Sequence, residues 1–196
     1  MAYHVYHTEA IVLESRPFGE GDRLLHLYTR ELGLVMAHAK SLREMRSRLR
    51  YALTTFSHAE VDLIYGKHGW KIISARPVDS LASIWRRKEK RSIIAQHAQL
   101  LRRLIQGEER HEALFDETLS ALAFLQQREG VETLRSAELL FVVRLLSRLG
   151  YWEDLKEFES LFVGSVWEDD VAIALVETSR TSLLRAANRA LRETQL

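Results

Sequence analysis

Residues 22–40, DRLLHLYTRELGLVMAHAK, alternate apolar and polar side chains on both sides of Gly33. Leu25 and Leu27 would share one face of an extended chain before the glycine. The alternation continues after it in Val35, Ala37 and Ala39. A period of two residues, interrupted by a glycine, is typical of a β-hairpin. The stretch therefore predicts two antiparallel strands with one buried face.

The segments on either side of this hairpin also predict strands. Upstream, TEAIVLE (8–14) predicts a first strand that runs into the turn RPFGEGD (16–22). Downstream, HAEVDLIYGKHGWKIISARP (58–77) predicts a second hairpin with GKHG at its tip, ended by Pro77. Five short strands within residues 1–80 predict a small antiparallel barrel rather than an open sheet.

The apolar period becomes helical after Ser83. A first helix carries Ile93 and Ile94 and stops at Gly107, and a second precedes Gly130. The run TLRSAELLFVVRLLSRLG (133–150) is apolar almost all round, which predicts the central helix of a bundle. A last amphipathic helix carries Leu183, Leu184, Ala187 and Leu191. We expect a helical domain over residues 81–196.

Composition limits the classes of function. The 196-residue chain has a formal net charge of +1, so any nucleic-acid surface must come from local clustering of basic residues. It has no cysteine, which excludes disulfides and thiolate metal sites. The first thirty residues are rich in charge and lack the apolar segment of a secretory signal. We expect a cytoplasmic protein.

The segment KSLREMRSRLR (40–50) is the strongest basic cluster in the predicted barrel. Five basic residues against Glu44 give it a net charge of +4. They are Lys40, Arg43, Arg46, Arg48 and Arg50. Clustered arginines contact phosphates, and the adjacent Tyr51 could stack on an unpaired base. The alternative is a solvated charged loop, which is what most charge runs are.

Other candidates for DNA contact come from the predicted turns and from the hairpin face. Arg16, Phe18 and Arg23 belong to the turn between the first two strands, and Tyr28 shares a hairpin face with His26 and His38. The second hairpin tip adds Lys67, His68, Trp70 and Lys71. Exposed aromatics beside basic residues suit base stacking, although Phe18 and Trp70 could instead be buried.

The sequence offers no catalytic or metal-binding motif. None of the eight histidines stands in a recognisable ligand spacing, and no Walker A loop, G-x-S-x-G or H-E-x-x-H is present. We therefore expect no catalytic residue, metal or cofactor. A hydrolase using His26 or His38 is one alternative, but no nucleophile or phosphate-binding motif accompanies them. A second basic run, RRKEKR (86–91), is either a solvated helix face or a binding surface that extends a DNA track or takes an acidic peptide tail.

Two longer stretches carry a family resemblance. Residues 8–40, TEAIVLESRPFGEGDRLLHLYTRELGLVMAHAK, and 47–75, SRLRYALTTFSHAEVDLIYGKHGWKIISA, resemble the N-terminal domain of the bacterial recombination mediator RecO family. LLSRLGYWEDL (145–155) is similar to the family's helical part. The resemblance implies an α+β protein: a five-stranded OB-fold β-barrel followed by an α-helical bundle. It also implies that strands two and three and their flanking loops form the binding face.

The resemblance further implies a non-enzymatic protein associated with the nucleoid. Family members bind single- and double-stranded DNA, anneal complementary strands and help to load recombinase. Their partners are RecR and the acidic C-terminal tail of the single-strand DNA-binding protein. The family's basic segment after strand three falls on residues 40–50 here. For a tail-binding groove, Arg144 and Arg148 are candidates, one turn apart on the central helix, unless they form surface ion pairs.

The chain also departs from the family pattern. Many members follow the LGY stretch with the cysteines of a zinc site, whereas Phe158 and Leu161 occupy the places of the first pair here. No zinc finger is therefore expected. The segment after this stretch is also short, which puts partner contacts made there in doubt.

For the function as a whole, the remaining alternative is a protein-docking adaptor with little direct DNA binding.

Overall fold

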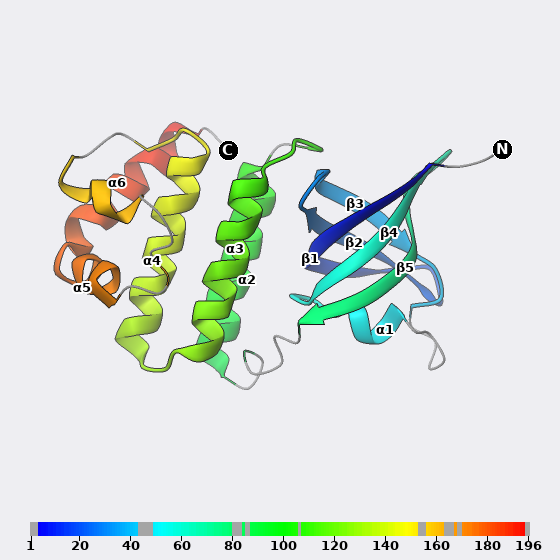
Figure 1. The fold of residues 1–196 in the computed structure, drawn as a ribbon, viewed down its shortest axis with the longest axis horizontal. Coiled ribbons are helices and arrows are strands. Elements are labelled where there is room, and N and C mark those ends of the chain that lie inside the picture. The colour runs from blue at the N-terminus through cyan, green and yellow to red at the C-terminus, as the bar shows by residue number, and fades with distance from the viewer. Residues whose placement is uncertain are drawn as a thin grey trace. The chain divides into compact units, whose positions relative to one another are not determined.

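The computed structural model describes residues 4–42, 49–79, 84, 87–105, 107–152, 156–162, 167 and 170–194. They form two compact units (Figure 1). The first, the barrel unit, is Met1–Ala82 together with Ile105–Phe115, and the second, the helical unit, is Ser83–Leu104 with Asp116–Leu196. Residues 105–115 thus belong to the barrel unit, although they follow the first helix of the helical unit in the chain.

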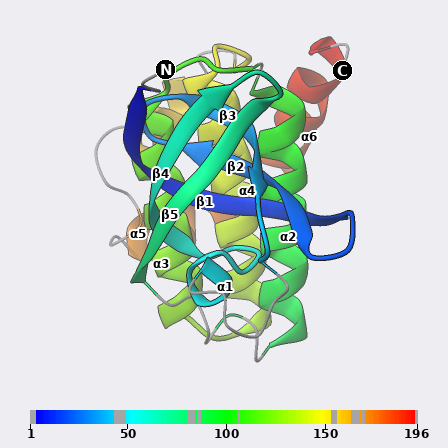
Figure 2. The ribbon, with the colours of Figure 1, turned by 90° about the vertical axis from the view of Figure 1, so that its right-hand side faces the viewer.

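Five strands close the barrel in the order β1-β2-β3-β5-β4 (Figure 2). They are β1 (Val5–Phe18), β2 (Asp22–Thr29), β3 (Gly33–Ala39), β4 (His58–Gly66) and β5 (Gly69–Asp79). β3 and β5 pair in parallel, and the other neighbours are antiparallel. The short helix α1 (Leu49–Ala52) lies between β3 and β4. This topology confirms the expected OB-fold barrel.

The alternation of the first hairpin fills the barrel interior as predicted. Leu25 and Leu27 are fully buried, and Val35, Ala37 and Ala39 meet them from β3. Each fully buried leucine contributes about 1.5–3 kcal/mol relative to an exposed one. Because side chains alternate along a strand, Leu24, His26 and His38 are left on the outer face.

Two strands are longer than expected. β1 continues to Phe18, because Arg16 and Pro17 still pair with β2, so that only residues 19–21 form the turn. β5 continues past Pro77, which lies opposite Ala59 next to an irregularity in the ladder. A proline is tolerated there because a bulge already interrupts the hydrogen-bond pattern.

Residues that join α2 (Lys88–Leu104) to the first turn of α3 (Glu112–Gln127) pack on the barrel. We call residues 107–115 the docking segment. Leu34 N–H donates to the Gly107 carbonyl at 3.0 Å, and the Tyr28 hydroxyl donates to the His111 carbonyl at 3.3 Å. Phe115 lies against Tyr28, with ring centroids 5.4 Å apart. The outer side of β2 is therefore covered at its C-terminal end.

The helical unit is a bundle around α4 (Figure 1). Its helices are α2 (Lys88–Leu104), α3 (Glu112–Gln127), α4 (Val131–Arg148), α5 (Asp170–Thr178) and α6 (Arg180–Glu193). A 3₁₀ helix spans Lys156–Leu161. α4 packs on α2, α5 and α6 and buries most of its side chains, which confirms it as the central helix. α5 was not expected as a separate helix.

His97 on α2 gives the helical unit a pH-dependent stability. The imidazole is 4% exposed and stacks on Phe141 with centroids 3.9 Å apart. Burial lowers the pKa of His97 to about 3, while a hydrogen bond with the Glu138 backbone acts in the opposite direction. The neutral ring is therefore the folded form at neutral pH.

This difference in proton binding makes a prediction. The unfolded chain binds a proton at His97 near pH 6.5 and the folded chain only near pH 3, so the free energy of unfolding falls as pH drops between these values. The slope is about 1.4 kcal/mol per pH unit, or roughly 2 kcal/mol between pH 6.5 and 5. Urea unfolding of the native chain and His97→Gln, from pH 7 to 5, measures it. Parallel pH profiles for the two proteins would contradict it.

Candidate nucleic-acid interface

The basic segment, residues 40–50, leaves the barrel at the end of β3. Arg43, Arg46 and Arg48 lie outside the described residues. Lys40 and Arg50 are exposed at its two ends, and Tyr51 is 81% exposed on α1. Buried Ala52 and Leu53 anchor the chain after it. The described ends of the segment thus present cations and one aromatic ring to solvent.

Asp22 holds the start of this segment. Its carboxylate accepts the Ser41 backbone N–H at 2.7 Å and lies 2.8 Å from His38 Nε2. The Ser41 hydrogen bond, followed by the hydrogen bond and charge of His38, lowers the pKa of Asp22. The ionised carboxylate therefore fixes the turn from which Lys40 and its neighbours extend.

The end of the β1–β2 hairpin adds two arginines and an exposed ring. Arg16 is exposed and pairs with Glu14 at 3.0 Å. Arg23 is more constrained, because it donates to the Ser15 hydroxyl and carbonyl at 2.5 and 2.6 Å. Phe18 is 53% exposed, and its ring meets that of His38 edge-on at 5.1 Å. All three residues lie on strands rather than in a loop.

Strand register brings separate candidates into one line. Arg16 on β1 is opposite Leu24 on β2, Leu24 is opposite His38 on β3, and His38 is opposite Lys71 on β5. We call these four residues the cross-strand row. Leu25 next to Leu24, Ala37 and Ala39 on either side of His38, and Trp70 and Ile72 on either side of Lys71 belong to the barrel core, so these members of the row point outward. The row therefore runs over the outer surface of four successive strands and brings Lys71 next to His38, although the two are distant in sequence.

Tyr28 and Trp70 do not join this face. Tyr28 is fully buried beneath the docking segment. Trp70 is 7% exposed and donates through its indole N–H to Glu108 at 2.6 Å. Neither ring offers a face to a base in this structure, so the predicted stacking by Tyr28 and Trp70 is corrected. Exposed apolar side chains nearby are Phe18, Met36, Tyr51 and Tyr65.

The tip of the β4–β5 hairpin is basic and exposed. Lys67 and His68 form the turn between the paired residues Gly66 and Gly69. Lys67 and Lys71 are both exposed, and Tyr65 beside them is 59% exposed. The hairpin tip predicted from the sequence is thus present, with its lysines available to a polyanion.

The two histidines of the hydrolase alternative are engaged with carboxylates. His26 Nε2 lies 3.7 Å from Glu14, and His38 pairs with Asp22. Within the described residues, no group of three or more histidine, aspartate or glutamate side chains is placed to hold a metal ion.

The second basic run is partly buried. Lys90 is 1% exposed, and its ammonium donates to the Glu129 carboxylate at 3.0 Å and to the Gln126 carbonyl at 3.3 Å. Arg87 also pairs with Glu129 at 3.0 Å. Neither prediction for this run anticipated a buried lysine that ties α2 to the end of α3.

Arg144 is a buried residue, not a partner-binding one. It is 2% exposed, donates twice to the Glu117 carboxylate and donates to the Leu161 carbonyl at 2.5 Å. Trp167 also donates to Glu117. Its predicted partner-binding role is therefore corrected. Arg148 is exposed and lines a hollow of about 240 Å³ with Ser147 and Phe162, so its role stays a prediction.

Models of known protein families match parts of both units. A family model described as "Recombination protein O N terminal" matches residues 1–81, and one described as "Recombination protein O C terminal" matches residues 90–157. Together they cover more than half of the chain. The chain belongs to the RecO family. Phe158 and Leu161, at which no zinc ligand was expected, are 2% and 0% exposed.

Curated relatives show the same likeness. A DNA repair protein RecO of Heliobacterium modesticaldum is 36% identical over 151 residues, which cover 77% of this chain and 54% of the relative. One of Desulfitobacterium hafniense is 31% identical, covering 78% and 55%. One of Thermodesulfovibrio yellowstonii is 34% identical, covering 77% and 60%. The chain thus spans little more than half the length of these relatives.

Among the described residues, no helix combines the length and the apolar character needed to span a bilayer.

The sequence did not reveal that Met36 is exposed on the outer surface of β3 or that the docking segment covers Tyr28. The docking segment carries mostly charged residues between Gly107 and Leu114. Leu114 and Phe115 at its end are apolar, and nothing in the sequence identified Tyr28 as the partner of Phe115.

Proposed function

We propose that this chain is a non-enzymatic, DNA-binding recombination mediator of DNA repair. It binds single- and double-stranded DNA, promotes annealing and helps to load recombinase, with RecR and the tail of the single-strand DNA-binding protein as partners. The cytoplasm, at the nucleoid, is its place of action. The observation that carries the proposal is the cross-strand row, which joins Arg16 to Lys71 on the outer face of an OB-fold barrel. The names of its relatives as DNA repair proteins support it.

The mechanism rests on neutralising phosphates. Two complementary strands repel each other through their backbones, and basic side chains that replace counterions lower that repulsion. The basic segment extends from the end of β3 beside Lys40, next to the hairpin end that holds Arg16 and Arg23. These cations bind the backbone without reading sequence, which suits a protein that acts on any strand.

With Tyr28 and Trp70 buried, base contact falls to Tyr51 and Phe18, which the sequence already offered as candidates, and to Met36. Phe18 and Met36, each 53% exposed, flank His38 on the outer face. Tyr51 is next to Arg50 at the far end of the basic segment. Exposed rings of this kind stack on unpaired bases with about 1–3 kcal/mol per base. They would hold bases apart from incorrect partners until complementary strands meet.

Fluorescence anisotropy of labelled single-stranded DNA over a salt series tests the proposal. Changing Arg46, Arg48 and Arg50 together to glutamate should weaken binding at least tenfold. Losing three phosphate contacts should flatten the log–log salt slope by about 2. Phe18→Ala should weaken binding without changing the slope, because a stacked ring releases no counterion.

The control variant changes Arg103 and Arg135, two exposed arginines of the helical unit, to glutamate. It should bind DNA like the native chain. If the triple variant and the native chain bind alike, the basic segment is a solvated loop. If neither binds, the protein-docking adaptor becomes the better account, since it requires partner binding but little DNA association.

A further inference from the structure

One face of α6 consists entirely of hydrogen-bond donors. With 3.6 residues per turn, six exposed residues share this stripe. They are Thr181, Ser182, Arg185, Asn188, Arg189 and Arg192. Glu193 is exposed one turn after Arg189 and borders the stripe, and the helix as a whole holds four arginines against this one carboxylate, a net charge of +3. The entire chain is only +1, so α6 concentrates positive charge.

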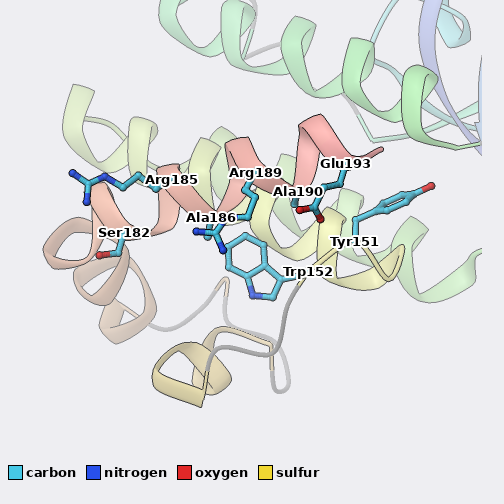
Figure 3. Close-up of a pocket in the computed structure, with 8 residues that line it drawn as sticks. All are labelled: Tyr151, Trp152, Ser182, Arg185, Ala186, Arg189, Ala190 and Glu193. Atoms are coloured by element: carbon cyan, nitrogen blue, oxygen red, sulfur yellow. The ribbon is translucent and has the colours of Figure 1, made fainter. Parts of the chain in front are cut away.

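A hollow accompanies the stripe. It measures about 210 Å³, and α6 lines it with Ser182, Arg185 and Arg189 while Tyr151 and Trp152 line it from the segment after α4 (Figure 3). The Arg189 side chain extends beside the Trp152 ring. Trp152 in turn packs on Phe162 with centroids 5.8 Å apart. Glu193, also at this hollow, lies at the C-terminal end of the helix.

We propose that the stripe and its hollow bind the phosphodiester backbone of a second nucleic-acid strand. The inference rests on the proposed function and extends it to the helical unit. The family match ends at residue 157, so α6 lies beyond the matched part of the chain. From Thr181 to Arg192 the donors extend over about 16 Å of helix, which suits a polyanion with a repeating charge.

The chemistry favours nucleic acid over an acidic peptide. Arginine and hydroxyl or amide donors together are the groups that most often contact phosphate oxygens. Tyr151 and Trp152 border the same hollow, and aromatic rings next to arginines hold single-stranded bases. With one strand on the barrel unit and another on the helical unit, a single chain would gather both strands for annealing.

A two-strand capture experiment tests the inference on the full chain. An immobilised oligothymidine is saturated with protein, and binding of a second, fluorescent, non-complementary strand is measured. R185E/R189E should reduce second-strand capture at least tenfold, while its first-strand affinity by anisotropy stays within threefold of the native value. R103E/R135E makes the same change in net charge on exposed residues of the same unit and should capture normally.

The outcomes separate the alternatives. Second-strand capture by R185E/R189E equal to the control overturns the inference. Loss of binding to a labelled peptide of aspartate and glutamate, with normal strand capture, also overturns it and assigns the stripe to an acidic peptide. If the native chain fails to bind the first strand, the proposed function falls and the inference with it. Should R185E/R189E unfold, as judged by circular dichroism, R185Q/R189Q decides by the same criteria.

Discussion

Replacing Arg144 by methionine lowers the free energy of unfolding by about 3–5 kcal/mol. Arg144 and Glu117 are 2% and 6% exposed, and the guanidinium donates twice to the carboxylate. The variant leaves the Glu117 charge buried, with the Trp167 indole N–H as its remaining donor among the described residues. It also leaves the Leu161 carbonyl without its donor. Urea unfolding at pH 7 measures the loss.

Two further variants make this expectation specific. Changing Glu117 to leucine together with Arg144 to methionine should recover much of the loss, because no isolated charge remains in the bundle. Arg135→Met removes an exposed pair with Glu132 at 2.8 Å and should cost less than about 1 kcal/mol. An Arg144→Met chain as stable as Arg135→Met would show that water reaches the Glu117 carboxylate in solution.

The position of α4 could be predicted from the sequence, but the environment of Arg144 on it could not. The run from Leu139 to Leu146 is apolar around the whole helix, which correctly predicted the central position of α4. An arginine within such a run has no solvated face to occupy. The prediction that Arg144 binds a partner or forms a surface ion pair was therefore wrong, and the pattern did not identify its actual partner, since Glu117 lies on another helix and is distant in sequence.

The barrel was predictable because its signals are local. Alternation in β2 and β3 decides which side chains point inward, and Gly33 and the GKHG tip place the turns. To place Lys71 next to His38 on the outer surface, the pairing of β3 with β5 was needed in addition. That pairing joins strands that α1 and β4 separate in the chain, so only the closed barrel establishes it.

The burial of Tyr28 and Trp70 could not be predicted from local sequence patterns. Alternation correctly put Tyr28 on the outer face, and an outer face is normally exposed. The docking segment covers it from more than seventy residues further along the chain, and Glu108 in that segment takes the indole N–H of Trp70. A tertiary contact between a loop of charged residues and a strand leaves no periodic mark in the sequence.

Where the docking segment contacts the barrel, we expect a single added methyl group to be most destabilising at Gly33. Its φ is +67°, and a Cβ there would lie 2.2 Å from the Glu109 carbonyl oxygen and 2.8 Å from the Glu109 nitrogen. Gly33→Ala therefore combines left-handed strain of about 1–2 kcal/mol with a clash against backbone. We expect a total loss of about 3 kcal/mol in the free energy of unfolding, the clash adding about 1–3 kcal/mol as in overpacked cores.

Gly19 supplies a matched control for this prediction. Its φ of +66° is nearly the same, but a Cβ there would meet nothing within 4 Å. Gly19→Ala should therefore show the strain alone, and the difference between the two variants measures the contact with the docking segment. Release of that segment should also expose Trp70 and shift the tryptophan emission to longer wavelength in Gly33→Ala only. Equal losses in the two variants, with unchanged emission, would mean that the docking segment does not hold this position in solution.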